Sequence, residues 1–287
     1  MLTVGAGATL VLPSDPRQWE QWVRHEDAST VTWWGHATVE IRLDGARLVT
    51  DPLLRRRVGP LHSQAYRPSR RDGDALASVD GVLLSNLHHD HTDLPSIRRF
   101  GPATTTVVPR GGGPLLRRHA KGPVLELAVG AEARLGGVRV EVTPARHDGD
   151  RLGLSAEAVG YLVRGSRTVY FAGDTEEFPE MAGLAAVAGG LDVAILPVSG
   201  WGLNLGPGHM DALAAARAVA VLRPRVAIPV HWGTLRIPVA WRLRRQHLLS
   251  AAVRFAALVA QLAPTTRVAV PVPGVPVALA ARTETST

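Results

Sequence analysis

The densest group of chemically active side chains lies in the segment Val82-Leu-Leu-Ser-Asn-Leu-His-His-Asp-His-Thr-Asp93. His88, Asp90 and His91 follow an apolar run that ends at Ser85. Packing does not explain such a group, because each polar side chain at the end of a buried strand would need its own partner. Imidazole and carboxylate are the ligands that zinc and similar cations prefer. The segment therefore predicts part of a metal site, in a tight loop before a helix.

Three further candidate ligands lie downstream, each after an expected β-strand. They are His147 after residues 138–143, Asp174 after residues 168–172, and His231 after residues 226–230. Loops that leave a rigid sheet are where α/β proteins build their sites. A lone histidine in such a place is more often structural, but six residues that share one pattern favour a common metal centre.

The elements that must position these residues follow from short β-rich runs and from the turn signals between them. Strands are expected at residues 31–34, 38–43, 47–50, 81–85, 105–108, 138–143, 158–163, 168–172, 193–197 and 226–230. Helices are expected at residues 93–99, 113–119, 179–187, 211–222 and 241–262. Hairpins followed by alternating strands and helices indicate an α/β sandwich, with two sheets inside and helices outside. Residues 1–30 are interpreted as a lead-in, and residues 31–287 as a single domain that includes a C-terminal helix and strand at about residues 240–280.

Composition excludes several classes of chemistry. The 287 residues include no cysteine, which rules out disulfides, thiolate metal sites, iron–sulfur clusters and cysteine nucleophiles. The formal net charge of +7 is almost entirely arginine, because Lys121 is the only lysine. Such a balance is typical of GC-rich coding bias, and no reader motif accompanies it, so the charge makes no strong case for a nucleic-acid partner. No apolar run is long enough for a membrane helix and no basic segment opens the chain, so we expect a cytoplasmic protein.

Several motifs, taken in order, resemble those of a known family. Ser85-Asn-Leu-His-His-Asp-His91 resembles the HxHxDH signature of the metallo-β-lactamase fold, and Ala172-Gly-Asp-Thr175 and Pro229-Val-His-Trp-Gly-Thr234 resemble its later motifs. A more specific set is similar to the branch that contains N-acyl phosphatidylethanolamine phospholipase D and the ascorbate-phosphate lactonases. This set comprises Trp33-Trp-Gly-His-Ala-Thr38, Thr50-Asp-Pro52 and Gly206-Pro-Gly-His-Met210. The resemblance runs from about residue 31 to 234 and thins over residues 236–287.

The resemblance implies a four-layer αββα sandwich with one or two zinc ions, or manganese or iron, between the loop ends of the two sheets. His88 and His147 would hold the first metal. Asp90, His91 and His231 would hold the second. Asp174 would bridge both, and a metal-bound hydroxide would be the nucleophile. Asp90 would also act in catalysis, by orienting the nucleophile or serving as a base.

The chain departs from the family signature at Asn86, which stands where the first histidine of the signature is expected. A neutral amide is a poorer zinc ligand than imidazole, so the first site is one donor short unless the Asn86 oxygen or a water completes it. The second site keeps all its protein ligands. A mononuclear enzyme and a weakly active or non-catalytic member are therefore both open.

Five further residues are candidates for supporting roles. Asp51 could fix the tautomer of a ligand histidine or could simply form an Asp-Pro turn. His36 could back the site or be a satisfied core histidine. His209 precedes an expected helix N-terminus and could donate to a substrate or a leaving group. Trp201 could line the substrate pocket. Arg56 belongs to an arginine-rich segment, residues 53–71, expected to be a long loop over the site, where its guanidinium could hold an anion.

These residues together predict a metal-dependent hydrolase. The first interpretation is attack on a phosphodiester or other ester-like bond in a small anionic substrate or a lipid headgroup. The alternatives are a lactonase acting on a phosphorylated sugar acid and a non-catalytic member impaired by Asn86. The helix expected at residues 241–262 could pack on its own core, on a second copy in a homo-oligomer, or on a membrane surface, and its own core is favoured.

Overall fold

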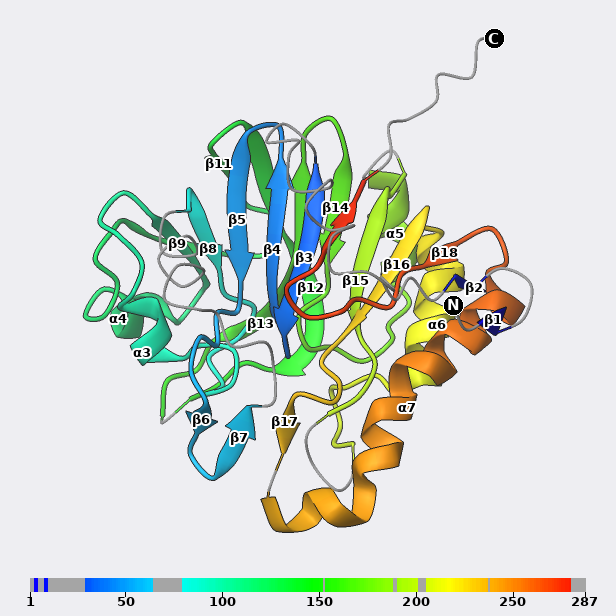
Figure 1. Ribbon diagram of the computed structural model, residues 1–287. Helices are drawn as coiled ribbons and strands as arrows, with labels where there is room; N and C mark the ends of the chain where they lie inside the picture. Colours follow the sequence, from blue (N-terminus) through cyan, green and yellow to red (C-terminus); the bar gives the residue numbers. More distant parts are fainter. Residues whose placement is uncertain are drawn as a thin grey trace, which may run out of the picture.

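Two seven-stranded sheets lie face to face, with helices on their outer sides (Figure 1). The computed structural model describes residues 3–4, 8–9, 29–63, 79–151, 153–187, 190–200, 205–236 and 238–279. The expected four-layer α/β sandwich is confirmed. Within the described residues, no helix is both long and apolar enough to cross a membrane.

The first sheet joins an antiparallel meander to a parallel half. β3, β4 and β5 are antiparallel, β8, β9 and β10 continue the sheet in parallel, and β19 closes the other edge against β3. In order across the sheet, the strands are β10 (Val124–Leu127), β9 (Thr105–Pro109), β8 (Gly81–Leu83), β5 (Ala46–Thr50), β4 (Thr38–Leu43), β3 (Thr30–Gly35) and β19 (Pro276–Ala278).

The second sheet has the same mixed character. β11 to β14 are antiparallel neighbours, and β14, β15, β16 and β18 are parallel. In order, the strands are β11 (Glu132–Leu135), β12 (Val138–Asp148), β13 (Glu157–Arg164), β14 (Thr168–Phe171), β15 (Val193–Pro197), β16 (Val226–Val230) and β18 (Arg267–Val268). Parallel neighbours end at the same edge of a sheet, so the loops after β14 and β16 emerge together.

The main core lies between the sheets because each strand sends alternate apolar side chains inward. Val39 and Ile41 of β4 are fully buried there against Tyr161 and Phe171 of the second sheet. Trp33 anchors the same core: its ring stacks on Trp232 with centroids 5.0 Å apart, and its Nε1 donates to the His36 carbonyl. The core therefore ends directly beneath the turn that carries His36.

The helices form the two outer layers. The second sheet is covered by α5 (Met181–Val187), α6 (Ala212–Leu222) and α7 (Pro238–Leu262). α3 (Leu94–Ile97) and α4 (Gly113–Leu116) pack at the outer face of the first sheet. Phe255 and Val259 of α7 are fully buried in the layer that contains α6, so the described side chains of α7 pack on the protein's own core, as expected.

All ten expected strands form, but the segment around His147 differs from expectation. β12 does not end at Thr143; it continues through a bulge between Pro144 and Asp148 and pairs Asp148 with Glu157. His147 therefore lies within a strand rather than after one. The bulge re-aims the strand, which is a common function of bulges beside active sites.

The arginine-rich segment is not wholly a loop. β6 (Arg57–Val58) and β7 (Leu61–Ser63) form a hairpin, and β7 pairs with β17 (Leu235–Arg236). Leu53, Val58, Leu61 and Leu235 bury their side chains together and hold this small sheet in place. Residues 64–78, which include Arg67, Arg70 and Arg71, lie outside the described residues. A short hairpin, β1 (Thr3–Val4) with β2 (Ala8–Thr9), also forms in the expected lead-in.

The N-cap of α6 gives a stability prediction. The Asp211 side chain accepts from the backbone N–H groups of Leu213 and Ala214, at 2.9 and 2.8 Å. We expect Asp211→Ala to lower the free energy of unfolding by about 1 kcal/mol, because two helix N–H groups lose their acceptor. Asp211→Asn keeps an acceptor and should lose less. Urea denaturation followed by tryptophan fluorescence measures both, and equal losses would show that the cap is not the cause.

Candidate metal centre

The loop after β8 is shaped by its own hydrogen bonds. The Asn86 side-chain oxygen accepts from the His88 N–H at 2.9 Å, and the Thr92 hydroxyl donates to the Asn86 carbonyl at 2.7 Å. Arg151, in the segment after β12, donates to the Leu87 and Thr92 carbonyls. The loop is thereby closed at both ends, and His88, Asp90 and His91 are presented from a fixed backbone.

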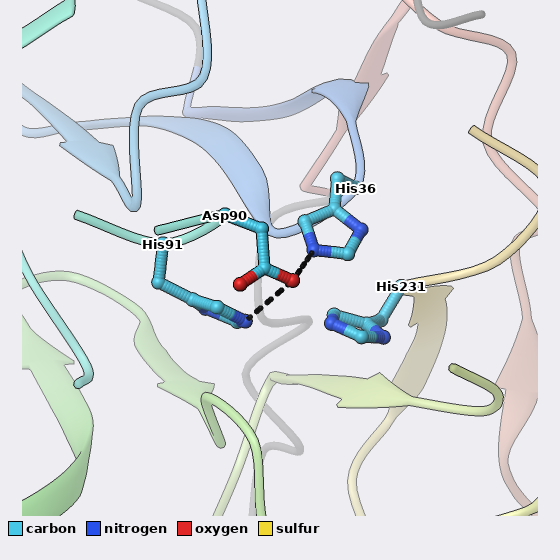
Figure 2. Close-up of side chains that lie close together, drawn as sticks. All are labelled: His36, Asp90, His91 and His231. Carbon is cyan, nitrogen blue, oxygen red and sulfur yellow. Dashed lines mark hydrogen bonds and ion pairs between the residues drawn. The ribbon is translucent and has the colours of Figure 1, made fainter. Parts of the chain in front are cut away.

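Four buried residues converge in a first cluster, shown in Figure 2: His36, Asp90, His91 and His231, with one ligand atom from each lying within 4.8 Å of the others. His36 Nε2 donates to Asp90 Oδ2 at 2.9 Å. His36 comes from the β3–β4 turn and His231 from the end of β16, and the His231 N–H donates to the His36 carbonyl at 3.0 Å. The cluster therefore joins the two sheets.

A second cluster lies beside the first, formed by His147, Asp174 and His209. His88 extends it, since its Nδ1 is 3.1 Å from His147 Nε2. Asp174 Oδ2 is 3.6 Å from His209 Nε2 and 4.0 Å from His147 Nε2. The same oxygen is 2.9 Å from His91 Nε2 and 3.3 Å from His231 Nε2 in the first cluster. Asp174 thus stands between the clusters, where the resemblance places a bridging carboxylate.

In three histidines of the two clusters, here called the inner histidines, the ring nitrogen that points away from the centre has an oxygen partner. Nδ1 of His91 lies 2.8 Å from Asp51 Oδ2, Nδ1 of His231 lies 2.8 Å from the Ser199 carbonyl, and Nδ1 of His147 lies 2.9 Å from the Gly208 carbonyl. These oxygens can only accept, so each Nδ1 carries a proton. Nε2 is then the nitrogen directed into the centre, which is the arrangement that orients histidines as metal ligands.

A divalent cation fits this donor set. His91 Nε2, His231 Nε2 and Asp174 Oδ1 are buried side-chain atoms without a hydrogen-bond partner. Buried polar atoms are rarely left in this state, and one ion placed among them would satisfy them. Zn–N bonds of about 2.0–2.1 Å separate tetrahedral ligand atoms by roughly 3.3 Å, which is close to the spacing between Asp174 Oδ2 and the surrounding nitrogens.

Electrostatics keep most donors in the form that binds metal. Burial lowers the pKa of His36 and of His147 to about 4, so both are neutral near pH 7. Burial alone would raise the pKa of Asp174, but the facing imidazoles of His231 and His91 hold it well below its ordinary value. His91 and His209 are the exceptions. Burial opposes the charge of His91, yet Asp174, Asp51 and Asp90 raise its pKa well above the ordinary value. The facing Asp174 carboxylate also raises the pKa of His209.

The structure brings the expected ligands together and adds two neighbours. The six candidate ligands lie in or against the two clusters: His88, Asp90, His91, His147, Asp174 and His231. His36, expected to back the site, and His209, expected to donate to a substrate or a leaving group, lie among them. Asp51 is fully buried and accepts from His91 as well as from the backbone N–H and hydroxyl of Ser85, so it does more than form a turn.

One of the two expected substrate contacts, Arg56, is exposed and does not lie at the centre. The other, Trp201, lies outside the described residues. A cavity of about 730 Å³ opens over the centre, and its described lining does not include Arg56. The arginine in the cavity wall is Arg151, whose guanidinium contacts His89 Nδ1 at 2.9 Å. His89 also lines the cavity.

Sequence reasoning missed Arg151 although a signal was present. Arg151 follows His147-Asp-Gly-Asp150 directly, so a basic residue stood near an expected ligand. The apolar side of the cavity was also missed: Val58, Pro60 and Leu61 of the β6–β7 hairpin line it. Their place depends on pairing between β7 and β17, which are far apart in the chain.

Comparison with known proteins identifies the family. Residues 46–232 match the sequence profile described as "Beta-lactamase superfamily domain", which covers more than half of the chain. The chain belongs to the β-lactamase superfamily. The matched residues include most of the histidines and carboxylates of both clusters.

Curated relatives of this superfamily member include metal-dependent hydrolases. A UPF0173 metal-dependent hydrolase of Symbiobacterium thermophilum is 32% identical over 214 residues, covering 73% of this chain and 86% of the relative. An uncharacterized protein of Mycobacterium tuberculosis is 31% identical over 242 residues, covering 79% of this chain. An N-acyl-phosphatidylethanolamine-hydrolyzing phospholipase D of Caenorhabditis elegans is 29% identical over 235 residues, covering 73% of this chain. The chain spans 65% of the length of the mycobacterial and nematode relatives.

Solved structures share the fold of this superfamily member. Igni18, a metallo hydrolase of Ignicoccus hospitalis, has a TM-score of 0.68 at 23% identity, over 88% of this chain and 99% of its own. CmlA, a diiron β-hydroxylase of Streptomyces venezuelae, has a TM-score of 0.63 at 19% identity, over 88% of this chain and 54% of its own. The His/Asp donor set of the two clusters is thus found in a member of a superfamily whose curated relatives include a metal-dependent hydrolase.

The Asp51–His91 contact gives a prediction on metal affinity. In Asp51→Asn, the new amide group can face His91 Nδ1, which then gives up its proton to Nε2 and presents an N–H to the centre. We expect metal affinity to fall by about 10–100-fold, measured by competition with a coloured chelator. Asp80→Asn is the control, because Asp80 also accepts a backbone N–H, from Arg47, but is exposed. An affinity within about twofold of the parent in Asp51→Asn would contradict the role assigned to Asp51.

The raised pKa of His91 predicts proton release on metal binding. Near pH 7 the metal-free protein holds a proton on His91 that the metal must displace, whereas His36 and His147 are already neutral. We expect at least about one proton to be released per chain at pH 7, and binding to weaken as the pH falls. Titration calorimetry in two buffers of different ionisation enthalpy measures this number. Heats that do not depend on the buffer would contradict it.

Proposed function

We propose that this protein hydrolyses a phosphodiester or another ester-like bond in an anionic substrate. The observation that carries the proposal is the composition of the cavity over the metal centre. Asp90, Asp174, His88 and His209 line it where the two clusters open, and Arg151 lies in its wall. The guanidinium cation of Arg151 and the metal-binding side chains share one cavity. This arrangement favours a substrate whose negative charge lies beside the bond to be cleaved.

The chain's own donors would hold the metal. The first cluster offers Asp90, His91 and His231, the second offers His88 and His147, and Asp174 stands between them. When bound, a divalent cation would supply a Lewis acid and lower the pKa of a coordinated water toward about 7. Zinc suits these nitrogen and oxygen donors, and manganese or iron would also be accommodated.

Asp90 is suited to orienting a nucleophile rather than to acting as a general base. Burial would raise its pKa, but the facing histidines, His91 first, hold the pKa well below the ordinary value. A carboxylate of such low pKa is a weak base at neutral pH. His36 fixes one Asp90 oxygen by its hydrogen bond of 2.9 Å, so the carboxylate keeps one orientation.

The remaining cavity wall supports a substrate with an apolar part. Val58, Pro60 and Leu61 of the β6–β7 hairpin and Leu205 line the cavity together with the polar residues. Apolar walls exclude water from the reacting groups and bind hydrocarbon. A lipid headgroup ester fits this combination. The nematode relative, an N-acyl-phosphatidylethanolamine-hydrolyzing phospholipase D, supports the same class.

The test compares bond types on the same metal-loaded protein. We expect turnover of a chromogenic phosphodiester with an aryl leaving group, and a kcat/KM lower by roughly 100-fold or more in His231→Ala and Asp174→Ala, because each change removes a metal ligand. His119→Ala is the control, because His119 contacts Arg98 and is not part of the described cavity lining. Faster hydrolysis of a sugar-acid lactone would favour the lactonase instead. Full activity in the two ligand variants would overturn the proposal.

A further inference from the structure

We propose that His209 is a metal ligand in this chain and takes the coordination position that Asn86 leaves open. The inference rests on the metal-dependent part of the proposed function and is independent of the substrate class. It assigns a complete second cluster, made of His88, His147, His209 and Asp174, and thereby a site for a second metal ion in addition to that of the first cluster.

Asn86 is already committed to the loop that carries the other ligands. Its side chain is fully buried. The side-chain oxygen accepts from the His88 N–H at 2.9 Å, and the side-chain nitrogen donates to Ser85 Oγ at 3.2 Å. Asn86 therefore supports the backbone of the ligand loop, and as a neutral amide it is a poorer metal donor than an imidazole from another segment.

His209 reaches the second cluster from another element, the segment before α6. Its Nε2 is 3.6 Å from Asp174 Oδ2, and its ring centroid is 4.6 Å from that of His147. One ligand atom from each of these three residues lies within 4.8 Å of the others. The 3.6 Å between His209 Nε2 and Asp174 Oδ2 is close to the spacing of two donors bound to one ion.

The His209 ring is oriented in the same way as the inner histidines. Its Nδ1 lies 3.1 Å from the Pro207 carbonyl and 3.3 Å from the Gly206 carbonyl, so Nδ1 carries the proton and Nε2 turns inward. His147 and His231 are arranged identically, with Nδ1 on a backbone carbonyl and Nε2 toward Asp174. A shared pattern of outward donors is how proteins orient metal-binding imidazoles.

The backbone on both sides of His209 is fixed against the cluster. Gly208 has φ +76°, and a Cβ there would come within 2.7 Å of His147 Nδ1, so only glycine allows this approach. On the other side, Met210 is fully buried in the helical layer and Asp211 caps α6. His209 is thus held between two anchored neighbours, which is the rigidity that a ligand requires.

With His209, the second cluster has enough donors of the right kind. His88 Nδ1, His147 Nε2, His209 Nε2 and an Asp174 oxygen make a set of three nitrogens and one oxygen. Four such donors complete a tetrahedral site, and fewer leave positions for water or substrate. His209 is 24% exposed at its side chain and lines the cavity, so it lies on the side of the cluster that faces the cavity.

Metal content of the full chain tests the assignment. The protein is stripped of metal, reloaded with Co²⁺ or Zn²⁺, freed of unbound ion by gel filtration, and analysed by mass spectrometry. We expect about two ions per chain in the parent and about one in His209→Ala. The Co²⁺ ligand-field absorption should weaken in parallel. His119→Ala is the matched histidine control and should keep about two ions.

Two further variants separate a ligand from a substrate donor. His209→Gln keeps a side-chain donor but is a poor ligand, so we expect it to lose an ion as His209→Ala does. Asn86→His in the His209→Ala background should restore about two ions, because it returns an imidazole to the loop. Circular dichroism identifies any variant that fails to fold. If the double variant with Asn86→His does not fold, the metal content of His209→Gln alone distinguishes a ligand from a substrate donor.

Three results would overturn the assignment. The first is about two tightly held ions in both His209→Ala and His209→Gln, with only kcat or KM altered; His209 would then be a substrate donor. The second is about one ion in the fully loaded parent. The third is an unchanged Co²⁺ spectrum in both variants. Failure of the substrate proposal is seen separately, as no phosphodiester turnover by a parent that holds about two ions.

Discussion

The buried carboxylate of Asp174 sets the main constraint on this structure. It is 3% exposed, and one of its oxygens has no hydrogen-bond partner. A charge in such a place is costly unless opposite charges or donors surround it. Four imidazole nitrogens face its other oxygen, from His91, His147, His209 and His231. The fold must therefore deliver four histidines, from four separate segments, to one carboxylate.

The two sheets meet this constraint jointly, which couples metal binding to their packing. The first sheet supplies the β3–β4 turn and the loop after β8, and the second supplies β12 and the loops after β14 and β16. An ion held by residues from both sheets would act as a cross-link between the layers. Because the ligands come together only in the folded state, binding free energy adds to folding free energy.

Much of this centre is predictable from the sequence because its parts are local or follow strand ends. His88, Asp90 and His91 share one loop, and Asp174 and His231 each follow an apolar strand that ends at the same edge of a parallel sheet. The ten expected strands form for the same reason: alternation and turn residues are local signals. The α/β sandwich was predicted from the order of the expected strands and helices, and its four-layer form from the family resemblance of the motifs.

The remainder depends on contacts between distant segments. Nothing near His209 in the sequence shows that Gly208 presses against His147, or that a bulge turns His147 inward from within β12. The partners of Asn86 were equally hidden, since an amide in a signature position suggests a lost ligand rather than a loop support. The small sheet that lines the cavity requires β7 to find β17.

The backbone at the centre has one further consequence. His36, Asp51 and His231 all have positive φ angles, of 51°, 36° and 61°. For residues with a side chain, this conformation costs of order 1 kcal/mol or more, and glycine would adopt it freely. Substitution by glycine at these positions would therefore relieve the backbone strain but would remove the imidazole and carboxylate side chains of the centre. The strained backbone at these positions is therefore offset by the contacts of their side chains, among them the His36–Asp90 and Asp51–His91 hydrogen bonds.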